Sequence, residues 1–136
     1  MGKRMTKETD QATRSDVTSS ELIGAVKQFL MESVLPSLSG RDQFNARVAA
    51  NVLGIIEREQ QISPALQALD AEAAQKWLPD RSSDADIPQQ LSRALAARDI
   101  TPDIEFMDYL KARQLLISDI NNPRYASRVV AEARWR

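Results

Sequence analysis

The chain contains no cysteine and no histidine. Without cysteine it can form no disulfide, no thiolate metal site and no cysteine nucleophile. Without histidine it lacks the usual general base, the commonest metal ligand and the side chain that titrates near neutral pH. These absences exclude most familiar catalytic arrangements, and we expect neither a metal site nor a cofactor.

Glycine and aromatic residues are scarce as well: the 136 residues include four glycines, and 5% are aromatic. Ala, Leu, Gln, Glu and Arg abound instead, and these residues favour helices, whereas strands favour β-branched and aromatic residues. Hydrophobic residues make up 43% of the chain and charged residues 27%, as in ordinary globular proteins. The composition therefore predicts one all-α domain, since a chain of this length forms a single core.

Long hydrophobic runs are also missing. No apolar run approaches the roughly 20 residues that span a bilayer, and the first residues lack the apolar core of a secretory signal. The net charge is −1, without the basic excess that is typical of nucleic-acid-binding domains. We therefore expect a cytoplasmic protein that binds neither membranes nor nucleic acid. Residues 1–17 are polar without periodicity and predict a disordered leader, followed by a single helical domain over 18–136.

Hydrophobic periodicity predicts a compact bundle of five or six helices. The first helix begins after Thr18, whose side chain forms a capping box with Glu21, and it ends near residue 35. The second helix, residues 41–60, has apolar residues around most of its circumference, which predicts the central helix of the bundle. Ser63-Pro64 predicts the start of a third helix, because serine caps helices and proline is favoured at the first helical position.

Turn-forming residues at 79–86 predict a loop. Two further helices are predicted on either side of Thr101-Pro102-Asp103, the first of them over residues 87–98. The second ends at Asn121-Asn122-Pro123, because the residue before proline is pushed away from helical dihedral angles. The last residues, 124–136, predict a short sixth helix.

One polar stripe interrupts the apolar surface of the 41–60 helix. Glycine inside a helix costs about 1 kcal/mol relative to alanine, so it indicates close approach of a ligand or of another segment. Arginine binds carboxylates and phosphates through two parallel hydrogen bonds, and asparagine both donates and accepts. At about 100° per residue, the four residues of the stripe lie within a sector roughly 60° wide. This candidate ligand-binding stripe consists of Arg47, Asn51, Gly54 and Arg58.

The alternative to an anion site is an internal ion-pair network. Buried polar groups in small domains are mostly satisfied within the protein. In that case the two arginines of the stripe would pair with acids on adjoining helices, such as Glu32, Asp108 or Asp119.

A second candidate surface lies near the C-terminus, where arginine, tyrosine and tryptophan gather. These residue types are enriched in the hot spots of protein interfaces. An ordinary helix end with a docking aromatic residue is the alternative, since asparagine before proline commonly stops a helix. The candidate partner-binding residues are Asn122, Arg124, Tyr125, Arg128 and Trp135.

No catalytic motif is present: the chain has no glycine-rich phosphate loop, no GxSxG elbow and no kinase signature. Acidic pairs such as Glu57 with Glu59, or Asp84 with Asp86, lie two residues apart, so on a helix they point in different directions. We therefore name no catalytic residue, and the sequence favours a non-catalytic protein over an enzyme.

Two segments carry a resemblance to a known family: FLMESVLPSLSGRDQFNARVAANVLGIIERE at 29–59 and DYLKARQLLISDINNPRY at 108–125. Through its leucine-proline link, an R-V-A-A-N-x-L helix followed by E-R-E, and a closing N-P-x-Y, the chain resembles a bacterial family of short, uncharacterised all-helical proteins. The resemblance extends over about residues 18–128. The polar signature of that family falls here on Arg47, Asn51, Glu57, Arg58, Glu59, Asn122, Pro123 and Tyr125.

The resemblance also implies a metabolic setting. Members of the family tend to be encoded beside aminoglycoside-phosphotransferase-like kinases and acyl-CoA dehydrogenases, which implies a part in acyl-CoA catabolism by association. The first hypothesis is therefore a non-catalytic accessory protein that binds such a kinase or dehydrogenase. The second is a module that binds a CoA- or phosphate-containing small molecule, and the third is an unrecognised enzyme. A homodimer is compatible with each.

Overall fold

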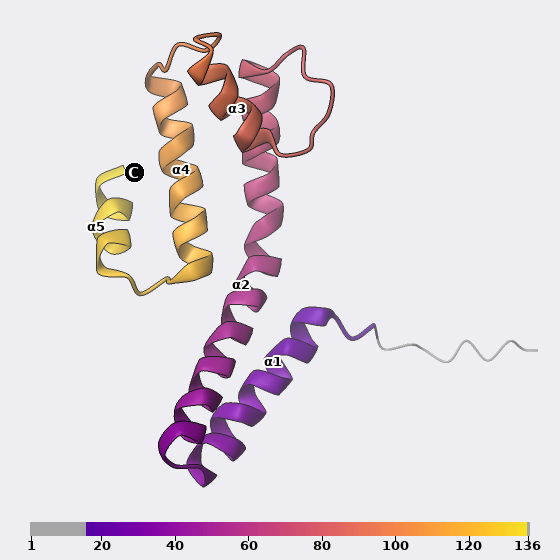
Figure 1. Cartoon of the computed structure of the whole chain (residues 1–136), viewed down its shortest axis with the longest axis vertical. Coiled ribbons are helices and arrows are strands. Elements are labelled where there is room, and N and C mark those ends of the chain that lie inside the picture. The colour runs from indigo at the N-terminus through magenta and orange to yellow at the C-terminus, as the bar shows by residue number, and fades with distance from the viewer. Residues whose placement is uncertain (1–15, 136) are drawn as a thin grey trace, which may run out of the picture.

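The computed structural model describes residues 16–135. Over this range it contains α-helices and no strand (Figure 1), so the predicted all-α fold of five or six helices is confirmed. The predicted leader, residues 1–17, lies almost entirely outside the described residues. The five helices are α1 (Ser19–Phe29), α2 (Gly40–Trp77), α3 (Ile87–Ala96), α4 (Ile104–Asn121) and α5 (Ala126–Trp135).

The first helix begins with the predicted capping box. The Thr18 hydroxyl oxygen accepts from the backbone N–H of Glu21 at 3.2 Å, and the Glu21 carboxylate accepts from the Thr18 N–H at 2.7 Å. After α1 the chain makes a π-helical turn at Leu30–Val34 and a 3-10 turn at Leu35–Ser37. Gly40 then opens α2 with φ +57°, a left-handed conformation that glycine adopts without steric cost. These turns reverse the chain, so that α1 packs against the N-terminal half of α2.

The second helix is longer than the sequence predicts. α2 runs without interruption through Pro64, so the predicted break at Ser63-Pro64 is wrong. Proline removes the hydrogen bond that an N–H at position 64 would donate to the carbonyl of Gln60. Pro64 and Gln60 are both exposed, so water can solvate that carbonyl and the helix continues. With 38 residues, α2 is about 57 Å long and spans the molecule (Figure 1).

The deep core lies at the C-terminal end of α2, where α3 and α4 pack against it (Figure 1). Three aromatic rings form its centre: the ring centroid of Trp77 lies 5.0 Å from that of Phe106 and 5.8 Å from that of Tyr109. Aliphatic side chains surround these rings. The remaining buried residues of this core are Ala73, Ala74, Ile87, Leu91 and Ile100.

The N-terminal half of α2 has much less buried surface. Between Ser19 and Glu59 the only buried residues are Ala50 and Gly54. Between the helices of this hairpin, the Lys27 ammonium contacts the Glu57 carboxylate at 2.5 Å. α2 is thus the central helix, as predicted, since α1, α3 and α4 all pack on it. Its two halves nevertheless have different surroundings, and the apolar residues of the 41–60 segment are largely exposed.

α4 brings the chain back along α2, and α5 then packs on α4. The Asp103 carboxylate accepts from the N–H of Phe106 at 2.8 Å and caps α4, which ends before Pro123 as predicted. The predicted sixth helix is present as α5, and Arg128 holds it to α4 by contacting Asp119 at 2.9 Å. No helix in residues 16–135 is long and apolar enough to cross a membrane.

Candidate functional site

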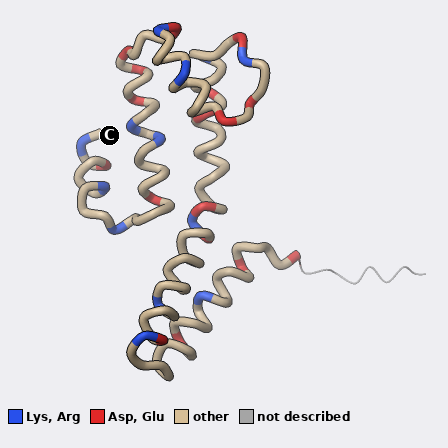
Figure 2. Tube along the Cα trace, viewed as in Figure 1, with Lys and Arg blue, Asp and Glu red and all other residues tan. Residues whose placement is uncertain are grey.

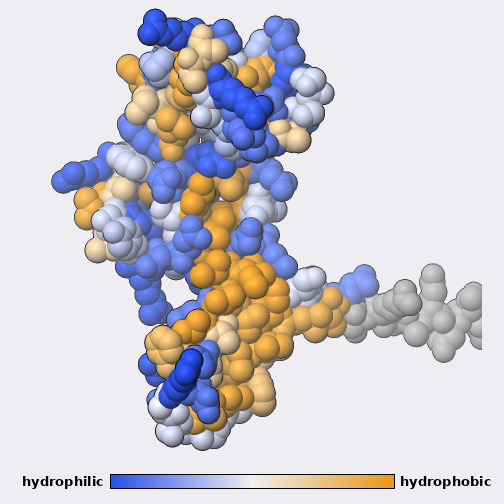
Figure 3. All heavy atoms as spheres, in the orientation of Figure 1, coloured by the Kyte–Doolittle hydropathy of each residue, from blue (hydrophilic) through white to orange (hydrophobic). Residues whose placement is uncertain are grey.

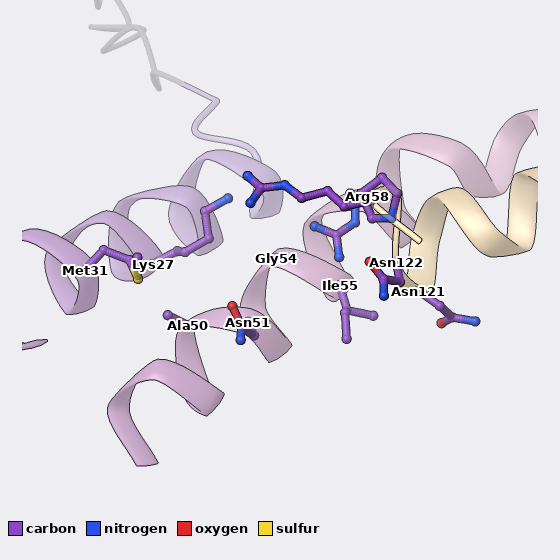
Figure 4. Close-up of a pocket in the computed structure, with 11 residues that line it drawn as sticks. Lys27, Met31, Ala50, Asn51, Gly54, Ile55, Arg58, Asn121 and Asn122 are labelled. Atoms are coloured by element: carbon purple, nitrogen blue, oxygen red, sulfur yellow. The ribbon is translucent and has the colours of Figure 1, made fainter. Parts of the chain in front are cut away.

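A polar groove of ≈ 580 Å³ lies where the α1–α2 hairpin meets the link between α4 and α5. Residues from three separate parts of the chain line it, and Figure 4 shows them converging from α1, from α2 and from the link. The groove unites the stripe on α2 with the Asn-Pro segment, two features that lie more than 60 residues apart in the sequence. The lining residues are Lys27, Met31, Ala50, Asn51, Gly54, Ile55, Arg58, Asn121, Asn122, Pro123 and Arg124.

The polar side chains of this groove are cations and amides. Lys27, Arg58 and Arg124 supply positive charge, and no carboxylate is among the lining residues. The charge of Lys27 is offset by its contact with Glu57, so the two arginines dominate the field in the groove. Amide groups can donate to an anion and orient it. The three amides of the lining are those of Asn51, Asn121 and Asn122.

One nitrogen of the Arg58 guanidinium makes a structural contact, and the other two are available to a ligand. Its Nε donates to the carbonyl oxygen of Ile120 at 2.9 Å, which fixes the C-terminal end of α4 against α2. The guanidinium has no carboxylate partner among residues 16–135, so its terminal nitrogens keep their capacity to bind an anion. Because the side chain is half-buried, it is less hydrated than a surface arginine.

The internal ion-pair interpretation of the stripe is wrong for this structure. Each of the three acids considered as partners contacts another residue: Glu32 accepts from Gln28, Asp108 pairs with Lys111 and Asp119 pairs with Arg128. Arg47 is exposed and, within the described part of the chain, has no ion pair either. It lies outside the groove lining, whereas the other three residues of the stripe are part of it.

Gly54 permits a close approach inside the groove. The residue is buried, and a Cβ added at this position would lie 3.3 Å from Nη1 of Arg58 and 3.8 Å from Cδ of Lys27. The absence of a side chain therefore lets the guanidinium and the lysine stem lie directly over the helix backbone. This contact explains why a glycine lies inside the helix; the sequence indicated only that another group approaches there closely.

The candidate partner-binding residues do not form one surface. Asn122 and Arg124 belong to the groove. Arg128 is internal: it pairs with Asp119 at 2.9 Å and with Glu132 at 3.1 Å, and so fastens α5 to α4. Tyr125 and Trp135 remain exposed, at 59% and 42%.

Among the polar residues of the groove, sequence reasoning missed Lys27 and Asn121. Lys27 appeared as one polar residue on an amphipathic helix, and Asn121 as a helix terminator. Their roles depend on how α1 folds back on α2 and where α4 ends. No local pattern contains that information, although Pro123 after two asparagines correctly predicted where α4 ends.

The sequence also did not reveal a buried polar network between α2 and α4. Asp70, 9% exposed, accepts from the Tyr109 hydroxyl at 2.7 Å and from Arg113 Nε at 3.0 Å. Burial raises the pKa of Tyr109 above its ordinary value, and the hydrogen bond to Asp70 raises it further. The feature of the sequence that could have indicated this network is Asp70, an acidic residue among the apolar residues that precede Trp77. The network anchors α4 to the core half of α2.

Carboxylates also line a second groove of ≈ 540 Å³ beside the Asp70 network. Each of these acids already has a structural contact. Asp70 binds Tyr109 and Arg113, Asp84 pairs with Arg81 at 2.7 Å, and the Asp86 side chain caps α3. No group of three or more acids that could hold a metal ion occurs within residues 16–135. This second groove therefore offers no pair of unengaged carboxylates for acid–base chemistry.

The fold and the groove together define an all-helical protein with a cation- and amide-lined site between a helical hairpin and a returning helix. The chain belongs to the family described as Domain of unknown function (DUF6285), whose model matches residues 36–125. This match confirms the resemblance to a family of unknown function. The comparisons with curated proteins and with solved structures gave no match.

Proposed function

We propose that this protein is a binding module whose groove holds the phosphate or carboxylate group of a small anionic ligand. The observation that carries the proposal is the composition of the lining: two arginines without carboxylate partners in residues 16–135, three asparagine amides and no acid. Guanidinium groups bind phosphate and carboxylate bidentately, and amides supply further directed hydrogen bonds. The chemistry selects an anion over a cation or a purely apolar ligand.

The size of the groove fits a small molecule. Its ≈ 580 Å³ fall within the range of about 300–1,000 Å³ that is typical of small-molecule sites. Met31, Ala50 and Ile55 give the lining an apolar part beside the polar one, so a ligand with both a phosphate and a less polar portion is favoured. The resemblance to a bacterial family encoded beside acyl-CoA dehydrogenases makes CoA and acyl-CoA the first compounds to test.

A second proposal concerns partners. The same resemblance supports a non-catalytic, cytoplasmic accessory protein that binds a phosphotransferase-like kinase or an acyl-CoA dehydrogenase. The exposed aromatic side chains of Tyr125 and Trp135 favour a contact near α5, since aromatic residues are enriched in interface hot spots. Stoichiometric co-purification of the full chain with either enzyme supports this proposal. Absence of any complex at micromolar concentrations contradicts it.

Thermal denaturation with and without ligand tests the groove. Inorganic phosphate, CoA, acetyl-CoA and ATP are the probes, and a ligand present at 100 times its dissociation constant adds about 2.7 kcal/mol to the free energy of unfolding. Arg124→Gln should weaken binding about tenfold or more, because it removes one of the two dominant charges. Arg93→Gln is the matched control, since Arg93 is exposed on α3 and lies outside the lining.

Two results would overturn the proposal. If none of the four probes raises the melting temperature or gives a binding isotherm, the groove does not hold ligands of this class. If Arg93→Gln weakens binding as much as Arg124→Gln does, the anion responds to overall charge and not to the groove.

A further inference from the structure

α5 is held in place by ion pairs more than by apolar packing. No residue of this helix is buried, and its two valines, Val129 and Val130, are 56% and 50% exposed. Figure 3 shows apolar atoms at the outer edge of α5, on the side away from α4. Burial of apolar area is the main force that docks one helix on another. Little of that force acts on α5, so the position of this helix depends on its polar contacts.

One arginine makes the contacts that fix α5. The Arg128 side chain is 14% exposed, and each of its two terminal nitrogens contacts one carboxylate. These are Asp119 at the end of α4, at 2.9 Å, and Glu132 one turn later in α5, at 3.1 Å. The Nε of Arg128 is buried and has no hydrogen-bond partner within residues 16–135, so nothing else holds the guanidinium. Partly buried ion pairs are screened by salt much less than exposed ones. The docking of α5 on α4 therefore rests on the Asp119–Arg128 pair.

The same pair controls the segment that completes the groove. Only four residues, 122–125, join α4 to α5, and three of them line the groove. The segment is a tight turn: the N–H of Tyr125 donates to the carbonyl oxygen of Asn122 at 3.1 Å, and the N–H of Arg128 donates to the carbonyl oxygen of Tyr125 at 3.0 Å. Arg124 lies within this turn. A movement of α5 therefore moves Arg124 relative to the groove.

The start of this turn is fixed independently of α5. Arg58 on α2 donates through Nε to the carbonyl oxygen of Ile120 at 2.9 Å and so holds the end of α4. Figure 2 shows basic positions along α5 and on the turn below it. Among the described residues Arg124 has no ion pair, so the backbone of the turn alone sets where its charge lies. With α5 docked, the turn keeps Arg124 in the groove together with Arg58.

We propose that α5 is a latch on the groove and that Arg128 is a positioning residue for the anion site. This inference rests on the proposed binding of an anion in the groove. Docking of α5 through the Asp119–Arg128 pair holds Arg124 where it binds the anion. Release of α5 withdraws Arg124 and lowers the affinity. Because such coupling is reciprocal, a bound anion also favours the docked position of α5.

Hydrogen–deuterium exchange of the full chain, measured by mass spectrometry, tests the latch without any ligand. Asp119→Asn should speed amide exchange in residues 126–135 about fivefold or more, because the neutral amide forms no ion pair with Arg128. Asp119→Glu keeps the charge and should exchange like the wild type. Asp108→Asn is the matched control, since Asp108 is also an acid of α4 but pairs within that helix, with Lys111. This control should leave the exchange of α5 unchanged.

Titration with inorganic phosphate and with CoA tests whether α5 controls the groove, and the direction of the change is decisive. Asp119 is an acid outside the groove lining, so by charge alone Asp119→Asn should tighten the binding of an anion. The latch predicts the opposite, a dissociation constant raised about three- to fivefold. In the Arg124→Gln background the same change should weaken binding no further, because its effect acts through Arg124.

Three results would overturn the latch. Wild-type α5 amides that exchange as fast as those of an unstructured peptide, or an Asp119→Asn variant that exchanges like the wild type, show that the ion pair does not dock α5. If Asp119→Asn leaves binding unchanged or tightens it while Arg124→Gln weakens it, α5 does not control the groove, although the proposed function stands. If neither probe binds the wild type, the proposed function fails, and the latch fails with it whatever the exchange rates are.

Discussion

The Gly54→Ala variant distinguishes the effect of Gly54 on the stability of α2 from its effect on ligand binding in the groove. Alanine is favoured over glycine in a helix interior by about 0.5–1 kcal/mol. Against this gain, the added Cβ would lie 3.3 Å from Nη1 of Arg58, closer than ordinary van der Waals contact. The contact is with the far end of a flexible side chain, which can shift by a few tenths of an ångström while Nε keeps its bond to Ile120.

Stability should therefore rise while ligand binding falls. We expect Gly54→Ala to increase the free energy of unfolding by about 0.5 kcal/mol, which raises the melting temperature by roughly 2 °C for a domain of this size. The displaced guanidinium and the smaller groove should raise the dissociation constant of an anionic ligand about three- to tenfold, equivalent to about 0.6–1.4 kcal/mol. Such opposite changes are the sign of a residue kept for a site at some cost in stability.

Denaturant unfolding and titration calorimetry measure the two effects, with Gly24→Ala as the matched control. Gly24 lies in α1, outside the groove lining, and a Cβ there would be 3.4 Å from Oε1 of Glu57. The control should gain stability without losing affinity. A Gly54→Ala variant that loses more than about 1 kcal/mol would show that the glycine serves packing. A more stable variant with unchanged affinity would refute its role in the groove.

Two further predictions concern the buried network. Asp70→Ala should lower the free energy of unfolding by about 2–3 kcal/mol in denaturant unfolding, since Tyr109 and Arg113 lose their shared acceptor, whereas Asp84→Ala, at an exposed pair, should cost less than about 1 kcal/mol. Because the pKa of Tyr109 is raised by burial, the stability that its neutral form contributes is complete below pH about 10 and is lost as the pH rises further. Tyr109→Phe should therefore unfold at higher pH than the wild type, and an identical alkaline midpoint would contradict this.

Sequence patterns predicted the local structure well where a cap or a stop signal acts on its own backbone. The capping box at Thr18 and the termination of α4 before Pro123 are both confirmed, because each depends on atoms within four residues. The apolar periodicity of α1 was also sufficient to predict its helix. These features need no knowledge of the tertiary structure.

Pro64 shows where local patterns stop being sufficient. Serine followed by proline starts many helices, and the same pair is tolerated in a helix when the carbonyl one turn earlier is open to water. Only the tertiary structure decides between the two, and here Gln60 is exposed. The 41–60 helix was expected to have neighbours on several sides, but its apolar residues Phe44 and Val48 remain exposed because α3 and α4 pack farther along α2.

The continuity of α2 is also what creates the groove. α4 has 18 residues and is about 27 Å long, and Trp77 lies 19 positions after Arg58, which is about 28 Å along α2. Since α4 starts beside the aromatic core at Trp77 and returns along α2, its last turn reaches the level of Arg58. A break at Pro64 would have left this distance undefined. The rigid helix thus places the stripe and the Asn-Pro link opposite each other, and the bond from Arg58 to the Ile120 carbonyl fixes that register.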